Sequence, residues 1–373
     1  MEFNKRMADI KLSIREITKL ASLTPDCIRF DIGQPDFDTP QHIKDGAIKA
    51  INEGFTGYTS SFGIPDLRKA IAEKEREKGL KIDEKNVLVT TGGIGALSCC
   101  ILGILEPGDE VISPNPFWSP YTFIVANAHG KLVETKFFEN GKFKRENIER
   151  NISEKTKAII VNTPENPTGR VIRKEDLETI ADIATENDLF LVSDEVYEKI
   201  TFGDAKHFAI ASMAPERTFL VNSCSKTYAM PGWRVGWVIG EERFIEEMMK
   251  INRALTACPN SIAQRAALTA LTGPQECVEE MRKEYEKRRN YAVKKLTEMG
   301  IDFLEPKGTF YVFPEVKQDS WKFSLGLLKE KKVSVVPGDA FGSAGRSRVR
   351  MSLTLTVDKI KEGLERIQRY LNK

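Results

Sequence analysis

The sequence has few of the residues that build metal centres and disulfide frameworks. Its 373 residues include three histidines and six cysteines, with no C-x-x-C pair and no H-E-x-x-H. This scarcity argues against a local zinc motif, although ligands from distant segments remain open. The cysteines are best interpreted as small apolar side chains in a reducing compartment. We therefore expect no metal.

An excess of charge of either sign is also missing. The 56 basic and 54 acidic side chains leave a net charge of +2, which provides no basic field for nucleic acid or anionic lipid. The opening segment, MEFNKRMADIKLSIREITKLASL, lacks the continuous apolar core of a signal peptide. The one uncharged stretch of membrane-spanning length, residues 86–105, is interrupted by glycines. We expect a cytoplasmic protein that binds neither nucleic acid nor membranes.

Apolar strand-like runs alternate with amphipathic helices along most of the chain, which is typical of an α/β protein with a mostly parallel sheet flanked by helices. Several runs are continuously apolar, as in strands buried on both faces. Strands are predicted at Asn86–Thr90, Glu110–Ser113, Ala158–Asn162, Leu189–Ser193, Thr218–Asn222 and Arg234–Ile239.

The composition changes towards the C-terminus. Thr39-Pro40 predicts an early helix capped by Thr39, whereas a long charged helix follows Pro274 and is succeeded by short strand-like segments. We therefore predict a large domain and a smaller α+β domain. The predicted boundaries are an N-terminal arm with part of the small domain at 1–44, the large domain at 45–275, and the small C-terminal domain with its linking helix at 276–373.

Lys226 is the most informative single residue. It follows an apolar strand and precedes a turn that contains Pro231 and Gly232. A lysine at a strand end that projects into a cleft loses solvation, which lowers its pKa and frees the amine as a nucleophile. Such an amine can form a Schiff base with an aldehyde cofactor. A solvated surface lysine is the alternative.

Asp194 closes the apolar run LFLVSD, where a carboxylate either caps a following helix or points into a functional crevice. Pyridoxal phosphate needs a carboxylate of this kind beside its ring nitrogen. Tyr197, three residues later, lies on the same side if a helical turn begins there, and would then reach the cofactor's phenolic oxygen.

The glycine-rich segment Thr91-Gly92-Gly93-Ile94-Gly95 lies between a strand and a helix. Glycines at such a place let backbone N–H groups approach a phosphate. A dinucleotide site is the competing interpretation, but the third glycine of G-x-G-x-x-G is replaced by Ser98, and the next strand does not end in an acidic residue.

Three further features have a functional and a structural interpretation. Asn166, in a turn-rich loop after a strand, has turn formation as its simplest role. Trp118 is either a core aromatic or a flat ring that stacks on a planar cofactor. Arg346, Arg348 and Arg350 alternate, so on a strand they share one face, and the spacing does not say which of them binds a ligand.

Together these motifs resemble the class I and II aminotransferases, the aspartate aminotransferase-like branch of fold type I pyridoxal-phosphate enzymes. The resemblance covers nearly the whole chain. It depends on the order and intervals of three segments: Asn166-Pro-Thr-Gly169, Asp194-Glu-Val-Tyr197 and Ser223-Cys-Ser-Lys-Thr-Tyr-Ala-Met-Pro-Gly-Trp-Arg234.

The resemblance implies a role for each matching residue. Lys226 is similar to the lysine that forms the Schiff base, Asp194 to the partner of the ring nitrogen, and Tyr197 with Asn166 to the pair at the phenolate oxygen. Trp118 is similar to the stacking aromatic. The residues that match the phosphate site are Gly92, Gly93, Ile94, Ser223, Ser225 and Arg234.

The resemblance also implies how the substrate and a second subunit are recognised. Arg350 matches the arginine that holds the substrate α-carboxylate, and its planar fork suits a bidentate contact. Gly33 matches a backbone contact to the same carboxylate, with Trp118 and Asn166 beside it. Tyr58 is similar to a tyrosine that reaches the phosphate of the neighbouring subunit, which implies a homodimer.

One position departs from the family pattern. Aspartate-preferring relatives often have a lysine after the phosphate-loop glycine pair, and here that residue is Ile94. The departure puts a dicarboxylate preference in doubt and leaves aromatic, branched and alanine-type donors open, unless a basic residue from another segment takes this role.

The resemblance implies ping-pong transfer of an amino group from an L-amino acid to a 2-oxo acid, with 2-oxoglutarate favoured and the Lys226 amine acting as general base. A C–S or β-lyase on the same scaffold shares this chemistry and stays an alternative. A non-catalytic pyridoxal-phosphate-binding regulator is an alternative of another class. The near-neutral charge and the lack of a preceding DNA-binding module argue against it.

Overall fold

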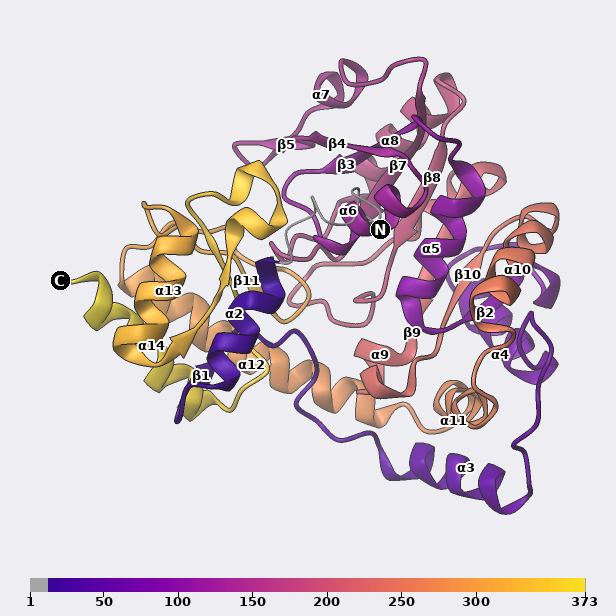
Figure 1. Cartoon of the computed structure of the whole chain (residues 1–373), viewed down its shortest axis with the longest axis horizontal. Coiled ribbons are helices and arrows are strands. Elements are labelled where there is room, and N and C mark those ends of the chain that lie inside the picture. Colours follow the sequence, from indigo (N-terminus) through magenta and orange to yellow (C-terminus); the bar gives the residue numbers. More distant parts are fainter. Residues whose placement is uncertain (1–12, 373) are drawn as a thin grey trace, which may run out of the picture.

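A twisted seven-stranded sheet forms the centre of the larger part of the molecule (Figure 1). The computed structural model describes residues 13–372, so residues 1–12 of the predicted N-terminal arm and residue 373 lie outside the described residues. In spatial order the strands are β2 (Val87–Thr90), β10 (Gly236–Ile239), β9 (Thr218–Ser223), β8 (Phe190–Asp194), β7 (Thr156–Asn162), β3 (Glu110–Pro114) and β4 (Lys131–Thr135).

The sheet is parallel except at one strand. Strand β10 runs antiparallel to both β2 and β9, and the remaining neighbours pair in parallel. All six strands predicted from the sequence are present, and β4 was missed. Strand β4, KLVET, lies at the sheet edge and is mostly half-exposed or exposed, so it lacks the continuous apolar run of a central strand.

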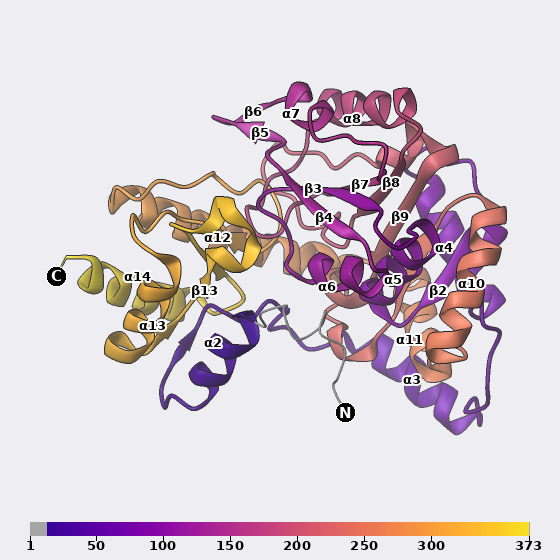
Figure 2. The ribbon, with the colours of Figure 1, turned by 45° about the horizontal axis from the view of Figure 1, so that its top comes forward.

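Helices cover both faces of the sheet because alternate strand residues point to opposite sides (Figure 2). On one face Leu88, Val192 and Val238 pack with α5 (Gly92–Ile104), α6 (Pro120–Asn127) and α10 (Glu242–Thr256). The other face packs on α3 (Gln41–Asn52), α4 (Pro65–Arg76), α8 (Lys174–Glu186) and α11 (Ser261–Thr272).

A second apolar core lies at the other end of the molecule. It joins Phe30 near the N-terminus to Leu296, Phe323 and Leu364 near the C-terminus. Figure 1 shows α2 and β1 beside the C-terminal helices, although they are far away in sequence. The elements of this group are α2 (Ser13–Ser22), α12 (Glu276–Glu298), α13 (Ser320–Lys331), α14 (Val357–Leu371), β1 (Ile28–Arg29), β11 (Tyr311–Val312), β12 (Val333–Ser334), β13 (Val336–Pro337) and β14 (Val349–Ser352).

The remaining regular elements are short: α7 (Arg145–Glu149), α9 (Cys224–Thr227), β5 (Phe138–Glu139) and β6 (Lys142–Phe143). The charged helix predicted after Pro274 is α12, which runs between the two groups of elements (Figure 1). The domain boundaries at residues 44 and 275 stay a prediction. Within residues 13–372, no helix has both the length and the apolar character that crossing a membrane requires.

The predicted cap of the first helix is wrong. Helix α3 begins at Gln41 with Pro40 at the N-cap position and no side-chain cap. The Thr39 hydroxyl instead donates to the carbonyl oxygen of Ala229 at 2.8 Å and accepts from Nε1 of Trp233 at 2.9 Å. The Thr39 hydroxyl is therefore used in tertiary contacts with distant residues and does not cap α3, as the local sequence had suggested.

The topology brings several strand ends to one edge of the sheet. Asn162 of β7 pairs with Asp194 of β8, and Asp194 pairs with Val221 of β9. Strand β2 ends at the same edge, because Gly236 of β10 lies opposite both Thr90 and Ser223. Ligands of open parallel sheets bind at this carboxyl edge, and the polar residues singled out from the sequence follow these strands.

Candidate active site

A cavity of about 970 Å³ lies at the carboxyl edge of the sheet, between the sheet and the second group of elements. Residues from widely separated segments line it. Those predicted from the sequence are Gly33, Gly93, Ile94, Trp118, Asn166, Asp194, Tyr197, Ser223, Ser225, Lys226, Arg234 and Arg350.

Lys226 lies in the short helix α9, directly after β9, and its side chain lines the cavity. Its Nζ donates to the carbonyl oxygen of Gly33 at 2.7 Å. Burial, together with the positive charges of Arg350 and Arg234, lowers the pKa of Lys226 to about 8. About a tenth of this amine is therefore unprotonated at pH 7, far more than of an ordinary lysine, and a nucleophile or base requires this neutral form.

Asp194 ends β8 and is 4% exposed. Its Oδ2 accepts a hydrogen bond of 2.7 Å from the hydroxyl of Tyr121. Burial raises the pKa of Asp194 to about 6, even though this hydrogen bond and the charge of Lys226 act in the opposite direction. The carboxylate is thus largely ionised at neutral pH in a place where a positive partner would relieve its poor solvation.

Tyr197 reaches the same cavity from the turn that follows β8. Its hydroxyl lies 3.0 Å from the hydroxyl of Tyr311, which in turn donates to the carbonyl oxygen of Gly33 at 3.4 Å. Burial, followed by the nearby Tyr311, raises the pKa of Tyr197 well above its ordinary value, so the phenol stays protonated. It therefore keeps a proton that it can donate in a hydrogen bond.

Arg350 is held on β14 with its guanidinium facing the cavity. One terminal nitrogen donates to Oδ1 of Asn166 at 3.2 Å and the other to the carbonyl oxygen of Asp31 at 3.1 Å, whereas the buried Nε has no hydrogen-bond partner. The guanidinium also lies 4.4 Å from the centre of the Tyr311 ring. No carboxylate pairs with Arg350 among the ion pairs of the described residues, so its charge is available to an anionic ligand.

The other two arginines of the alternating segment lie elsewhere. Arg348 precedes β14 and pairs with Asp302 at 2.8 Å, and Arg346 is 77% exposed at its side chain. The structure thus selects Arg350 from three arginines that the spacing alone did not distinguish.

The glycine segment forms a narrow cradle at the start of α5. Gly92 has φ of +73°, and a Cβ there would come within 2.5 Å of the Arg234 guanidinium. A Cβ on Gly236 would come within 2.6 Å of the Gly93 nitrogen. Helix α5 has no side-chain N-cap, so its first N–H groups are free of a capping residue at a site that favours anions.

Side chains from two other elements complete the lining near this cradle. Ser223 and Ser225 are buried residues at the end of β9 and in α9. Trp118 packs edge-on against Tyr121, with ring centres 5.4 Å apart. A hydroxyl pair, an arginine and a helix N-terminus fit a phosphate, and the adjacent Lys226 and Asp194 fit a charged aromatic aldehyde.

Two residues named from the sequence do not line the cavity. Gly92 lies next to the Arg234 guanidinium but outside the cavity lining, and Tyr58 is 93% exposed on the surface. Sequence reasoning also missed residues that do contribute. Tyr121 and Tyr311 hold Asp194 and Tyr197 but carry no motif. Their only signals were aromatic positions in PFWSPY and GTFYVF, which are typical of cores as well.

Arg15 was missed for a different reason. It belongs to α2, whose pattern is that of an ordinary amphipathic helix, yet it lines the cavity together with Thr18. Within the described residues, the cations of the lining are Arg15, Lys226, Arg234 and Arg350. Only the tertiary arrangement of α2 brings Arg15 to this place.

Comparisons with known proteins agree with this geometry. The sequence model for "Aminotransferase class I and II" matches residues 25–367. The chain belongs to the class I and II aminotransferases. This membership confirms the family resemblance, the fold type I architecture and the aminotransferase activity that were expected from the sequence.

Relatives of this class match over nearly the whole chain. An aspartate aminotransferase of Pyrococcus abyssi is 43% identical over 96% of this chain and 95% of its own, and an aromatic-amino-acid aminotransferase 2 of Thermococcus litoralis is 41% identical with the same coverage. The solved structure of a Thermus thermophilus aspartate aminotransferase with maleate superimposes with a TM-score of 0.94 at 37% identity, over 99% of both chains. The donor remains open, since relatives with aspartate and aromatic names match about equally well.

Proposed function

We propose that the cavity binds pyridoxal 5'-phosphate through Lys226 and transfers an amino group from an L-amino acid to a 2-oxo acid. When bound, this cofactor supplies an aldehyde that takes the amino group and a ring that accepts electrons from the substrate α-carbon. The observation that carries the proposal is the Lys226 amine, with a pKa of about 8, in one cavity with Asp194 and Arg350.

The phosphate end is assigned to the α5 cradle. Backbone N–H groups of Gly93 and Ile94, the hydroxyls of Ser223 and Ser225, and the Arg234 guanidinium are the donors that a phosphate dianion needs. Gly92 contributes by lacking a side chain, because a Cβ there would meet Arg234.

The ring of the cofactor is assigned to Asp194 and to hydrogen-bond donors that follow the neighbouring strands. Asp194 carries the negative charge that keeps a ring nitrogen protonated, and Tyr121 fixes the carboxylate. Tyr197 and Asn166 donate to an oxygen on the ring, and Trp118 offers a flat face. Asn166 is available for this because its amide oxygen already accepts from Arg350.

The proton transfer is assigned to Lys226. Its neutral amine accepts a proton from the substrate α-carbon and, within the same half-reaction, would donate it to the former aldehyde carbon of the cofactor. The nearby Arg350 and Arg234 oppose a permanent positive charge on this amine, so the proton is easily released. In this way the same groups that lower the pKa of Lys226 also support its function as a general base.

The substrate α-carboxylate is assigned to Arg350, whose Nε has no other partner. Gly33 lies beside it, and a side chain at position 33 would come within 2.5 Å of the Tyr311 hydroxyl. The absence of a Cβ thus leaves room for the carboxylate against the backbone.

The substrate side chain is assigned to the wall between α2 and α5. Ile94, 41% exposed, and Leu97 give this wall an apolar surface, while Arg15 provides a cation. We infer that Arg15 takes the second carboxylate of 2-oxoglutarate and that apolar donors use the Ile94 surface. A solved relative contains maleate, a dicarboxylate, which is consistent with an anion at both ends of the substrate.

The active unit is proposed to be a homodimer in the cytoplasm. Tyr58 is 93% exposed in the single chain, which is unusual for a large aromatic side chain and favours a contact with a second copy. Its hydroxyl is then a candidate donor to the phosphate in the partner subunit. Sedimentation of the purified protein tests this assignment.

The test of the proposed function is a transamination assay on purified protein supplied with pyridoxal phosphate. A panel of aspartate, alanine, tyrosine, phenylalanine, kynurenine and branched donors with 2-oxoglutarate identifies the donor. Lys226→Ala should lose turnover by about 10⁴-fold, because both the Schiff-base amine and the base are gone. Full activity in this variant would remove Lys226 from the mechanism.

A further inference from the structure

The turn that carries Asp194 and Tyr197 has a second, buried side. Asp194 and Tyr197 line the cavity, whereas Glu195 and Glu198, each one residue further along, extend into a cluster of charges on α4. Glu195 is fully buried and Glu198 is 5% exposed. The backbone closes this turn, since the Glu198 N–H donates to the Glu195 carbonyl oxygen at 2.9 Å.

Two lysines face these carboxylates. Lys74 Nζ lies 3.0 Å from Oε1 of Glu198. Lys78 Nζ pairs with Glu198, lies 3.6 Å from Oε2 of Glu195, and lies 2.5 Å from Oε2 of the buried Glu75. Lys78 therefore joins the end of α4 to both acids of the turn.

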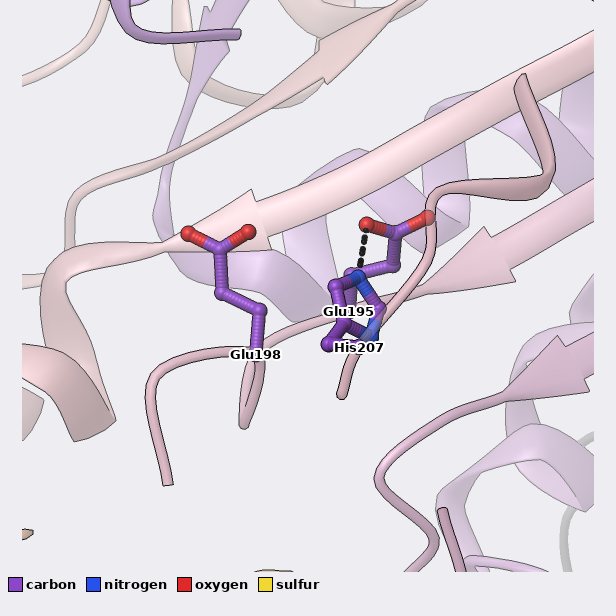
Figure 3. A group of neighbouring side chains, drawn as sticks. All are labelled: Glu195, Glu198 and His207. Carbon is purple, nitrogen blue, oxygen red and sulfur yellow. Dashed lines mark hydrogen bonds and ion pairs between the residues drawn. The ribbon is translucent and has the colours of Figure 1, made fainter. Parts of the chain in front are cut away.

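His207 contacts the same carboxylate oxygen of Glu195 as Lys78. Its Nε2 is 2.7 Å from Oε2 of Glu195. Figure 3 marks this hydrogen bond with a dashed line. One ligand atom each from Glu195, Glu198 and His207 lies within 4.8 Å of the others, a spacing that a metal ion would accept. The Lys78 ammonium already lies at ion-pair distance from both carboxylates, however, so the cluster is an ion network and not a metal site.

The network holds charges of both signs close together in a buried place. Three buried carboxylates (Glu75, Glu195 and Glu198) face two ammonium groups and one imidazole. Burial alone would raise the pKa of Glu198, but Lys74 and Lys78 hold it well below its ordinary value. Removing one member changes how well its partners are compensated in a poorly solvated place. The turn after Asp194 belongs to no helix or strand, and neither do Lys78 and His207.

We propose that Lys78, Glu198 and the Glu195–His207 pair are positioning residues that hold the turn so that Asp194 and Tyr197 stay in place in the cavity. The inference rests on the proposed function, because it concerns the two groups assigned to the cofactor ring. The network touches neither substrate nor cofactor in this account, and it acts through the backbone between residues 194 and 198.

The test uses the pH midpoint of the visible absorption change of the enzyme loaded with pyridoxal phosphate. Lys78→Met and Glu198→Gln remove charges of opposite sign. Displacement of Asp194 and Tyr197 moves the midpoint in the same direction in both variants, towards higher pH by about one unit, and lowers kcat by about 10- to 100-fold with a smaller change in KM. A field effect of the lost charge alone would instead move the two midpoints in opposite directions, and this result would overturn the proposal.

Two further variants separate positioning from stability. Lys81→Met makes the same substitution at an exposed lysine three residues after Lys78, and it should leave midpoint and kcat unchanged. His207→Phe keeps a ring and removes the bond to Glu195. This variant should also shift the midpoint towards higher pH. If Lys78→Met or Glu198→Gln fails to fold, His207→Phe tests whether the network positions the turn.

The proposal would be overturned if the three variants Lys78→Met, Glu198→Gln and His207→Phe fold, keep the midpoint of the wild type and differ only by a lower melting temperature. The network would then be merely structural. A wild-type protein that acquires no visible band contradicts the proposed function instead. The two failures are therefore distinguishable.

Discussion

The two sides of the turn at residues 194–198 use the same kind of side chain for opposite purposes. Lys226 on the cavity side and Lys78 on the α4 side are both largely withdrawn from solvent. Burial, Arg350 and Arg234 lower the pKa of Lys226 to about 8, whereas burial at Lys78 is outweighed by Glu198, Glu75 and Glu195, which raise its pKa.

The difference lies in the sign of the neighbouring charges. Within residues 13–372, the cations that line the cavity have no carboxylate at ion-pair distance, so the cavity side has affinity for anions and a reactive amine. On the α4 side, Lys74 and Lys78 are both paired with acids, so their amines stay protonated and unreactive. A functional lysine is therefore identified by the charges of the groups around it and not by burial alone.

The largest predicted effect tests the unpaired cation of the cavity. Arg350→Ala should lower kcat/KM by about 1000-fold for every donor, because truncating a buried, hydrogen-bonded charge that binds a carboxylate typically costs 2–5 kcal/mol. Steady-state kinetics over the donor panel measures it. Arg346→Ala, at a side chain that is 77% exposed, is the matched control and should change kcat/KM by less than about threefold. Equal effects of the two substitutions would remove the distinction between them.

The next effect concerns the amine itself. Capture of pyridoxal phosphate by the cofactor-free protein requires the neutral form of Lys226, whose pKa is about 8. Its rate should therefore rise about tenfold per pH unit below pH 8 and level off above it, a change of roughly 100-fold between pH 6 and pH 8.5. Stopped-flow absorbance measures the rate. A profile that keeps rising to pH 10 would assign Lys226 the ordinary pKa of a solvated lysine.

A smaller effect concerns the stability of the cofactor-free protein. The pKa of Asp194 is raised to about 6 by burial, so its contribution to stability is fully present below pH 4 and is lost as the pH rises through 6. Asp194→Asn should therefore stabilise the cofactor-free protein at pH 7.5 by about 1–3 kcal/mol, with little difference near pH 4, while it lowers transaminase activity. Thermal unfolding at the two pH values measures it. A variant that is equally destabilised at both would contradict the assigned burial cost.

The smallest predicted effect separates the two ends of the substrate. Arg15→Ala should raise the KM for 2-oxoglutarate about fivefold and leave the KM for alanine within about twofold, because a partly exposed ion pair contributes about 1 kcal/mol. Steady-state kinetics with 2-oxoglutarate and with alanine measure the two KM values. Lys19→Ala, on the same helix and exposed, is the control. An equal rise for both substrates would place Arg15 outside the side-chain pocket.

Much of this site follows from local sequence because parallel strands align their carboxyl ends. Asp194, Ser223 and Lys226 each follow an apolar run, and that pattern is enough to predict a shared edge. The choice of Arg350 over Arg346 and Arg348 was not predictable from spacing, since only the strand bounds and the Asp302 ion pair distinguish them.

Site residues that come from distant segments of the chain could not be predicted from the sequence, for a physical reason. Arg15 and Tyr311 belong to elements whose patterns report burial and amphipathicity but not position in the fold. Thr39 was misassigned as a helix cap because a tertiary partner, Ala229, competes for its hydroxyl. The network around Lys78 was missed for the same reason: a charged residue at or just after the end of a helix is normally solvated, and here the fold closes over it.

The most direct test of the account asks which lysine binds the cofactor. The holoenzyme is reduced with borohydride, digested, and mapped by mass spectrometry. The account predicts a pyridoxyl group on Lys226 and none on Lys74 or Lys78. Labelling of Lys74 or Lys78, or of no lysine, would contradict it.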